Sequence, residues 1–209
     1  MAGGLLLERR GFPLPAGLAW LPLIAKAQLV PILAVPLGVS LLLRRRWATL
    51  GAAIACWAAL LGVSLLLRPG WPLVWWEQTR PYTGGYSAAI IATPALGLPL
   101  LLAALGLAAL AWRRRADDLL LCALIVAASL ATPQRAIYEA TALLVAVAYL
   151  LRDCRLAAAV IAASWLMLLQ PILGVTPDQI ILLAIYAPIL AGLWARAGQE
   201  GLYRPKASP

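Results

Sequence analysis

The sequence predicts an all-α membrane protein, a polytopic transmembrane helical bundle of about seven to eight membrane segments, some of them short or broken. Hydrophobic residues make up 64% of the 209 residues and charged residues only 12%, and the mean hydropathy is +0.89. The apolar residues fall in long runs that arginine clusters separate. A soluble domain of this length could not bury so much apolar surface, so the chain belongs in a bilayer.

The basic residues indicate how the chain threads through the membrane. The formal net charge is +9, and thirteen of the seventeen Lys and Arg residues lie in clusters between apolar runs. The clusters are Arg9-Arg10, Arg44-Arg45-Arg46, Arg113-Arg114-Arg115, Arg152 with Arg155, and Arg196 with Arg204 and Lys206. Because Lys and Arg collect in cytoplasmic loops, these clusters predict a multi-pass plasma-membrane protein with its basic loops in the cytoplasm. They are too short, and lack the polar scaffold, for a nucleic-acid surface.

The apolar runs give the expected elements in order. They cover residues 13–25, 28–43, 47–67, 87–112, 119–131, 137–151, 156–170 and 179–195. The first two runs could form one long helix, which Lys26 and three prolines would interrupt. A single crossing would put the first two arginine clusters on opposite sides, so we favour a hairpin with Lys26 near its tip. Residues 1–197 then form the transmembrane domain, and residues 198–209 a disordered cytoplasmic tail.

The N-terminus lacks the basic start and the cleavage site of a signal peptide. It resembles the end of a membrane helix entering the cytoplasm, so we expect a fragment or a late start codon. The chain has no histidine, which excludes His-based acid–base chemistry and the usual zinc sites. Its three cysteines are far apart and predict neither a disulfide nor a metal site. The residues point to no particular cofactor.

The loop 68–86 on the predicted outer side is rich in aromatic residues. Trp75, Trp76 and Tyr82 lie there, with Glu77 and Arg80 among them. An aromatic belt, or an amphipathic helix lying on the membrane from position 71 to 79, would explain this composition. The alternative is a platform that binds a sugar or a lipid headgroup, in which aromatic faces stack on a sugar ring and Arg80 holds a phosphate. The glycine pair at positions 84 and 85 would then let the loop fold over a ligand.

Lys26 and Gln28 lie at or near membrane depth. A charge at that depth is costly and suggests a functional site. Lys26 either extends its side chain to the outer interface or faces a cavity as the counter-charge of a phosphate.

A third polar group follows the run 119–131. Thr132 and Pro133 form a good helix start. Arg135 and Glu139 could then pair at i,i+4, although this order and position suit the helix dipole poorly. Alternatively, Arg135 beside free helix N–H groups forms an anion site. Thr176, Pro177 and Asp178 repeat the cap, and there a purely structural role is favoured.

The order of these motifs resembles the C-terminal portion of glycosyltransferase family 87, multi-pass enzymes of the GT-C superfamily. That family commonly shows Lys-Pro-Gln, a basic-Trp cluster and Ser-Pro…Tyr-Asp in this order. The matching residues are Lys26, Gln28, Arg44 to Trp47, Thr132, Pro133, Tyr138 and Glu139. The resemblance covers about residues 9–155. Ala27 replaces the usual proline, and the acidic residue of the family's first outer loop has no equivalent.

The resemblance implies transfer of a hexose, possibly mannose, from a polyprenyl-phosphate donor to a lipid or glycan acceptor on the outer face. In that reading Lys26, Arg80 and Arg135 neutralise the donor phosphate. Glu139 and Glu77 are the candidate catalytic bases; Gln28, Trp75, Trp76, Tyr82 and Tyr138 complete the substrate site. Because the N-terminal acidic loop is absent, this chain alone is expected to lack a complete catalytic site. The alternatives are a non-catalytic membrane scaffold subunit and a transporter component for lipid-linked sugars.

Overall fold

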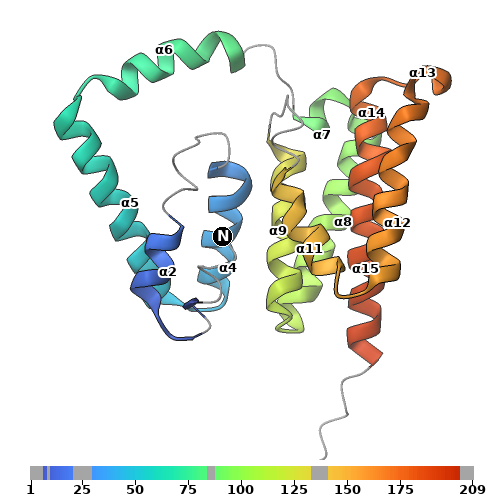
Figure 1. The fold of residues 1–209 in the computed structure, drawn as a ribbon, viewed down its shortest axis with the longest axis horizontal. Coiled ribbons are helices and arrows are strands. Elements are labelled where there is room, and N and C mark those ends of the chain that lie inside the picture. Colours follow the sequence, from blue (N-terminus) through green and yellow to red (C-terminus); the bar gives the residue numbers. More distant parts are fainter. Residues whose placement is uncertain (1–6, 9, 21–29, 84–87, 133–140, 203–209) are drawn as a thin grey trace, which may run out of the picture. The chain divides into compact units, whose positions relative to one another are not determined.

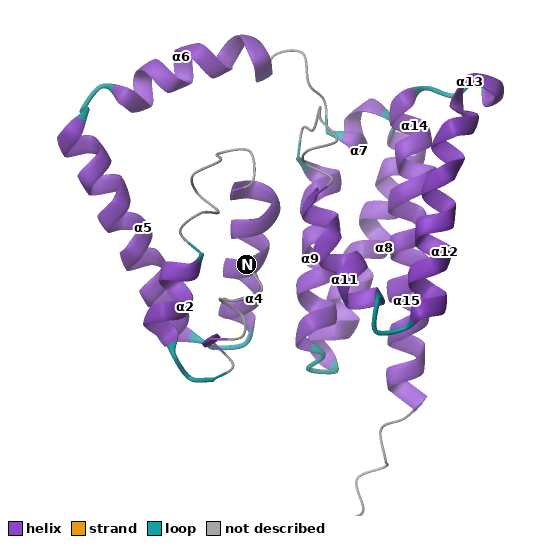
Figure 2. Cartoon of the chain, in the orientation of Figure 1, coloured by secondary structure: helices purple, strands orange, loops and turns teal. Residues whose placement is uncertain are grey.

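The computed structural model describes residues 7, 8, 10–20, 30–83, 88–132 and 141–202. Within these ranges every regular element is a helix, and helices and their connecting turns are all that Figure 2 shows of the described chain. The chain divides into two compact units, Met1–Tyr86 and Ser87–Pro209. The all-helical class predicted from the apolar runs is therefore confirmed for the described residues.

Four helices are long and apolar enough to cross a membrane. They are Trp47–Leu67, Pro94–Arg113, Cys154–Leu173 and Pro177–Gln199. Each coincides with an apolar run of the sequence, which supports a membrane-embedded protein. The described residues do not reach the expected seven to eight segments. A shorter apolar helix covers Ile32–Leu43, and α9 (Asp117–Ala131) has only 15 residues.

The first unit is built around α5 (Trp47–Leu67), whose N-terminal half packs against α2 (Pro13–Ala19) and α4 (Val35–Leu43). Gly17 on α2 makes a close contact with α5. A Cβ atom built at Gly17 would lie 2.9 Å from the backbone carbon of Ala52 and from the backbone nitrogen of Ala53. Small residues permit such approaches between membrane helices. A π-helical turn, η1 (Val30–Ala34), leads directly into α4.

The helix α6 (Trp71–Thr83) follows at the C-terminal end of α5. Arg68, directly after the predicted run 47–67, is the C-cap residue of α5, and its carbonyl accepts a hydrogen bond from the backbone N–H of Trp71. The helix α6 begins there. Figure 1 shows α6 running across the end of α5 rather than continuing it.

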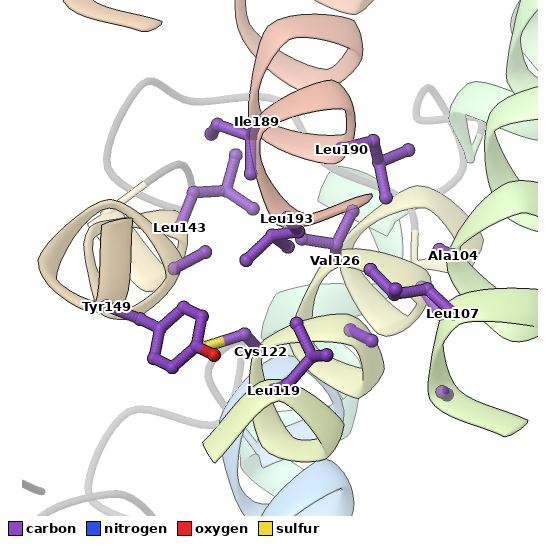
Figure 3. Close-up of a cluster of buried hydrophobic side chains, with 14 of the residues drawn as sticks. Ala104, Leu107, Leu119, Cys122, Val126, Leu143, Tyr149, Ile189, Leu190 and Leu193 are labelled. Carbon is purple, nitrogen blue, oxygen red and sulfur yellow. The ribbon is translucent and has the colours of Figure 1, made fainter. Parts of the chain in front are cut away.

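The second unit has a hydrophobic core centred on α9. The helices α8 (Pro94–Arg113) and α9 form a hairpin, and α11 (Leu144–Leu150) and α15 (Ala187–Leu202) pack against α9. Figure 3 shows Leu119, Cys122 and Val126 of α9 among side chains from these neighbours. α9 is buried along almost its whole length, so its surroundings are protein more than lipid.

The remaining helices of this unit are short or interrupted. They are α7 (Ala89–Ala92), the 3-10 turn η2 (Thr141–Leu143), α12 (Cys154–Ser164), the 3-10 segment η3 (Trp165–Leu169), α13 (Gln170–Leu173), α14 (Pro177–Ile181) and the π-helical turn η4 (Leu182–Tyr186). The elements α12, η3 and α13 follow one another without a break, and so do α14, η4 and α15.

The helix α15 corrects one sequence expectation. A disordered tail was predicted from residue 198, but α15 continues to Leu202. Ala197 is buried, and its carbonyl accepts a hydrogen bond of 2.7 Å from Arg114 Nη1. This contact holds the end of α15 against the α8–α9 turn, which explains why the helix extends beyond the apolar run. Residues 203–209 lie outside the described residues.

Candidate functional site

The part of the predicted site that the structure describes lies on α6. Trp75 and Trp76 are 42% and 58% exposed, and Glu77 is exposed beside them. Leu73 is 71% exposed one turn before Glu77. Of the explanations left open for this loop, a helix beginning at Trp71 is observed, and it extends to Thr83 rather than Thr79. α6 thus presents an apolar first half and a more polar second half.

Helix geometry groups the candidates on α6 into two sets. Successive residues on an α-helix point about 100° apart, and residues three or four apart share a face. On the backbone of α6, Arg80 follows Trp76 by one turn, and Tyr82 follows Trp75 by two turns. The side chains of Arg80 and Tyr82 lie outside the described residues. The pairing of an aromatic face with a cation on α6 therefore stays an expectation from the sequence.

The other candidates lie outside the described residues. These are Lys26 and Gln28 between α2 and η1, and Arg135, Tyr138 and Glu139 between α9 and η2. The first two belong to the first unit and the other three to the second unit. The structure therefore brings together Trp75, Trp76 and Glu77 on one helix, and the other candidates stay predictions from the sequence.

Of the polar group that follows α9 (residues 132–139), the structure describes Thr132. It caps the C-terminus of α9, and its backbone is extended, with φ −95° and ψ 136°. An extended backbone is also what an N-cap residue needs. The conformation is thus compatible with the predicted helix start, which itself lies outside the described residues.

The structure adds two ion pairs that the sequence did not predict. Arg46 Nε lies 3.3 Å from a carboxylate oxygen of Glu8, whose side chain is only 4% exposed. Arg152 Nη2 lies 3.1 Å from a carboxylate oxygen of Asp118, and its guanidinium carbon lies 5.2 Å from the ring centre of Tyr149. The signal in the sequence was the presence of acidic residues next to basic clusters. Adjacency along the chain does not indicate which arginine each acid pairs with, because Arg46 and Arg152 are distant in sequence from Glu8 and Asp118.

Two turns that join helices in these basic clusters share one backbone conformation. We call them the arginine turns; they cover residues 44–46, between α4 and α5, and 114–116, between α8 and α9. Arg45 and Arg115 have left-handed backbones, with φ of 56° and 55°. The same pair of hydrogen bonds closes each turn: from Arg45 to Leu42 and from Arg46 to Leu41, and from Arg115 to Trp112 and from Ala116 to Ala111. This is the Schellman pattern, in which glycine usually takes the left-handed position.

The described residues contain no group of three or more His, Cys, Asp and Glu side chains that could hold a metal ion. The three cysteines are free thiols. The described part of the site therefore offers aromatic faces, a carboxylate and a helix at the end of a membrane-length segment. No protein-family model, curated protein or solved structure matches the chain.

Proposed function

We propose that the chain is an integral membrane glycosyltransferase, or the C-terminal part of one. It would transfer a hexose, possibly mannose, from a polyprenyl-phosphate donor to a lipid or glycan acceptor on the outer face of the plasma membrane. The observation that carries the proposal is α6, a helix with exposed Trp75, Trp76 and Glu77 that runs across the end of the membrane-length helix α5 (Figure 1). A donor with a lipid tail and a sugar phosphate head would meet a protein at this depth.

The proposed chemistry is a substitution at the anomeric carbon of the sugar. A hydroxyl oxygen of the acceptor attacks that carbon, and the bond from the carbon to the phosphate oxygen breaks. The leaving polyprenyl phosphate keeps the electron pair, and the hydroxyl proton passes to a carboxylate, Glu77 or Glu139. Charge grows on the phosphate as the bond breaks, so the cations Lys26, Arg80 and Arg135 would lower the barrier.

The remaining candidates would position the sugar. Trp75, Trp76 and Tyr82 offer aromatic faces for stacking, and Gln28 and Tyr138 offer hydrogen bonds to hydroxyl groups. In this proposal the membrane domain has about seven to eight segments, of which the four described spans are part, with the basic loops in the cytoplasm. The helix α6 then lies at the outer interface.

The test is incorporation of labelled sugar. Membranes expressing the full-length gene receive a labelled polyprenyl-phosphate sugar, and labelled lipid or glycan is counted. We expect the double variant Lys26→Ala/Arg135→Ala to lose most of the incorporation. Unchanged incorporation would refute the role of these two cations. Trp75→Ala/Trp76→Ala should also reduce incorporation, whereas Trp165→Ala should not, because Trp165 is also strongly exposed but lies on η3, outside the candidate site.

The two carboxylates need a separate comparison. Glu77→Gln and Glu139→Gln each keep the size of the side chain and remove the base. We expect one of them to lower the turnover rate at saturating donor by about 100-fold or more. Asp178→Asn is the matched control, because Asp178 is an exposed acid at a helix start. If neither Glu variant slows the reaction more than this control does, the base belongs to another residue.

The alternatives predict different results. A scaffold subunit would incorporate no sugar alone but would raise incorporation by a partner enzyme. A transporter component requires polar groups along the membrane interior. Among the described residues, the buried polar or charged side chains are Glu8, Ser40, Thr49 and Ser129. So small a set favours the transferase over the transporter.

A further inference from the structure

The two arginine turns repeat one local structure in the two units of the chain. The residue before the left-handed arginine has nearly the same backbone in both turns: φ −84° and ψ −1° at Arg44, φ −83° and ψ −4° at Arg114. In each turn the next helix begins two residues after the left-handed arginine. The repetition is structural, since the sequences around the turns otherwise differ.

Arginine is an unexpected residue at the left-handed position. The Cβ atom disfavours this conformation, and glycine adopts it freely. The closing hydrogen bonds come from backbone N–H groups, which any residue other than proline would supply. Within the part of the chain that the structure describes, the exposed side chains of Arg45 and Arg115 make no ion pair and no hydrogen bond. The turns therefore do not need these guanidinium groups for their own conformation.

The position of the two turns at the ends of membrane-length helices indicates which part of the bilayer the guanidinium groups of Arg45 and Arg115 can reach. One turn directly precedes the membrane-length helix α5, and the other directly follows α8. Each turn has a strongly exposed tryptophan close by, Trp47 at 60% and Trp112 at 54%. Exposed tryptophan at the end of a membrane helix marks the level of the lipid headgroups. Arg45 and Arg115 would thus lie at the level of the lipid phosphates.

We propose that Arg45 and Arg115 each bind the phosphate of an anionic phospholipid, one lipid at each arginine turn. A guanidinium group donates two parallel hydrogen bonds to a phosphate, and basic clusters next to membrane helices attract anionic headgroups. The neighbouring tryptophan contacts the glycerol and the upper acyl chain. Both lipid sites are independent of sugar transfer, and the one at Arg45 lies at the opposite end of α5 from α6.

The test uses the purified full-length chain in neutral detergent micelles, titrated with phosphatidylglycerol and followed by native mass spectrometry. We expect two tightly bound phosphatidylglycerol molecules and no comparable binding of phosphatidylcholine. Arg45→Gly and Arg115→Gly should each weaken one of the two sites by about fivefold, and the double variant should weaken both. The control is Arg10→Gln/Arg155→Gln, which removes two exposed arginines of the same predicted face outside the turns and should leave both sites intact.

Each other outcome overturns the proposal. Equal losses in the Gly double variant and in the control would mean diffuse surface charge, and no loss in the Gly variant would mean that these arginines bind no lipid. Displacement of the lipid by an equal concentration of inorganic phosphate would mean a site for free phosphate instead. If the Gly double variant melts at a lower temperature in phosphatidylcholine, Arg45→Asn/Arg115→Asn decides by the same lipid titration, because asparagine also accepts the left-handed backbone.

Discussion

Among the glycines that the structure describes, Gly17 has the least room for a side chain. A Cβ atom there would meet backbone atoms of Ala52 and Ala53 at 2.9 Å, and backbone cannot move aside as a flexible side chain can. Gly17→Ala should therefore push α2 away from α5 and destabilise the unit by ~1–3 kcal/mol. Thermal unfolding in detergent, followed by circular dichroism, measures the effect.

Gly38 provides the matched control for this prediction. It also lies inside a helix, α4, but a Cβ atom built there meets nothing within 4 Å. Gly38→Ala should leave the melting temperature unchanged or raise it, since alanine favours a helix over glycine by about 0.5–1 kcal/mol. Equal destabilisation by both substitutions would contradict the close contact between α2 and α5.

The two ion pairs differ in burial, so their removal should differ in cost. Arg46→Met leaves the buried carboxylate of Glu8 without its partner, which should destabilise the unit by ~1–3 kcal/mol. Arg152→Met breaks a pair whose side chains are 53% and 28% exposed, and should cost at most about 1 kcal/mol. Chemical denaturation of both variants tests this order.

A second substitution identifies the cause of the larger effect. Adding Glu8→Gln to Arg46→Met should restore much of the lost stability, because the neutral amide no longer needs a cation beside it. A double variant as unstable as Arg46→Met alone would show that the arginine acts through packing rather than through charge.

At the scale of single elements, the start of α14 shows a complete capping box. The backbone N–H of Thr176 donates to Gln179 Oε1 at 2.9 Å, and the backbone N–H of Gln179 donates to Thr176 Oγ1 at 3.3 Å. The cap predicted from Thr176, Pro177 and Asp178 is confirmed. Thr176→Ala should cost ~1 kcal/mol and speed amide hydrogen exchange in the first turn of α14. Thr176→Ser is the control and should keep slow exchange; equally fast exchange in both variants would contradict the capping role.

The bounds of individual elements show what local signals can and cannot predict. The run 47–67 matches α5 at both ends, because arginine precedes it and Arg68 and Pro69 follow it. The run 119–131 misses the first two residues of α9, because Asp117 and Asp118 are polar yet favour the first turn of a helix. Nothing in the apolar pattern indicates the 3-10 segment η3, which continues α12 without a change in composition.

At the scale of the whole molecule, the predicted orientation can be tested with a native thiol. Cys154 is exposed and lies between Arg152 and Arg155, in a loop predicted to be cytoplasmic. A membrane-impermeant maleimide should therefore label Cys154 only after the cells are opened. In a Cys56→Ala background, Gly70→Cys at the α5–α6 turn should be labelled on intact cells. Labelling of Cys154 on intact cells would reverse the orientation and place α6 inside.

The helical class of the fold was predictable from composition, whereas the structure describes only part of the candidate site. Hydropathy and arginine clusters are local signals, so they locate helices whatever the helices pack against. A site depends on contacts between distant segments. The α6 residues Trp75, Trp76 and Glu77 share one helix and could be found together, but no local pattern relates Lys26 to Arg135. The left-handed arginines had no signature, since the usual marker of that conformation is glycine.

The burial of α9 has a consequence for how the protein is made. The ribosome completes α9 before η2, α11 and α15, which later cover it with side chains such as Leu143 of η2 and Leu193 of α15 (Figure 3). During that interval the apolar surface of α9 has the earlier helices α7 and α8 and the acyl chains of the lipid as its neighbours within the described part of its unit. Lipid thus solvates this surface of α9 temporarily, until the helices made later displace the acyl chains from it. A nascent chain released after α9 should stay in the membrane as a substrate for quality-control proteases.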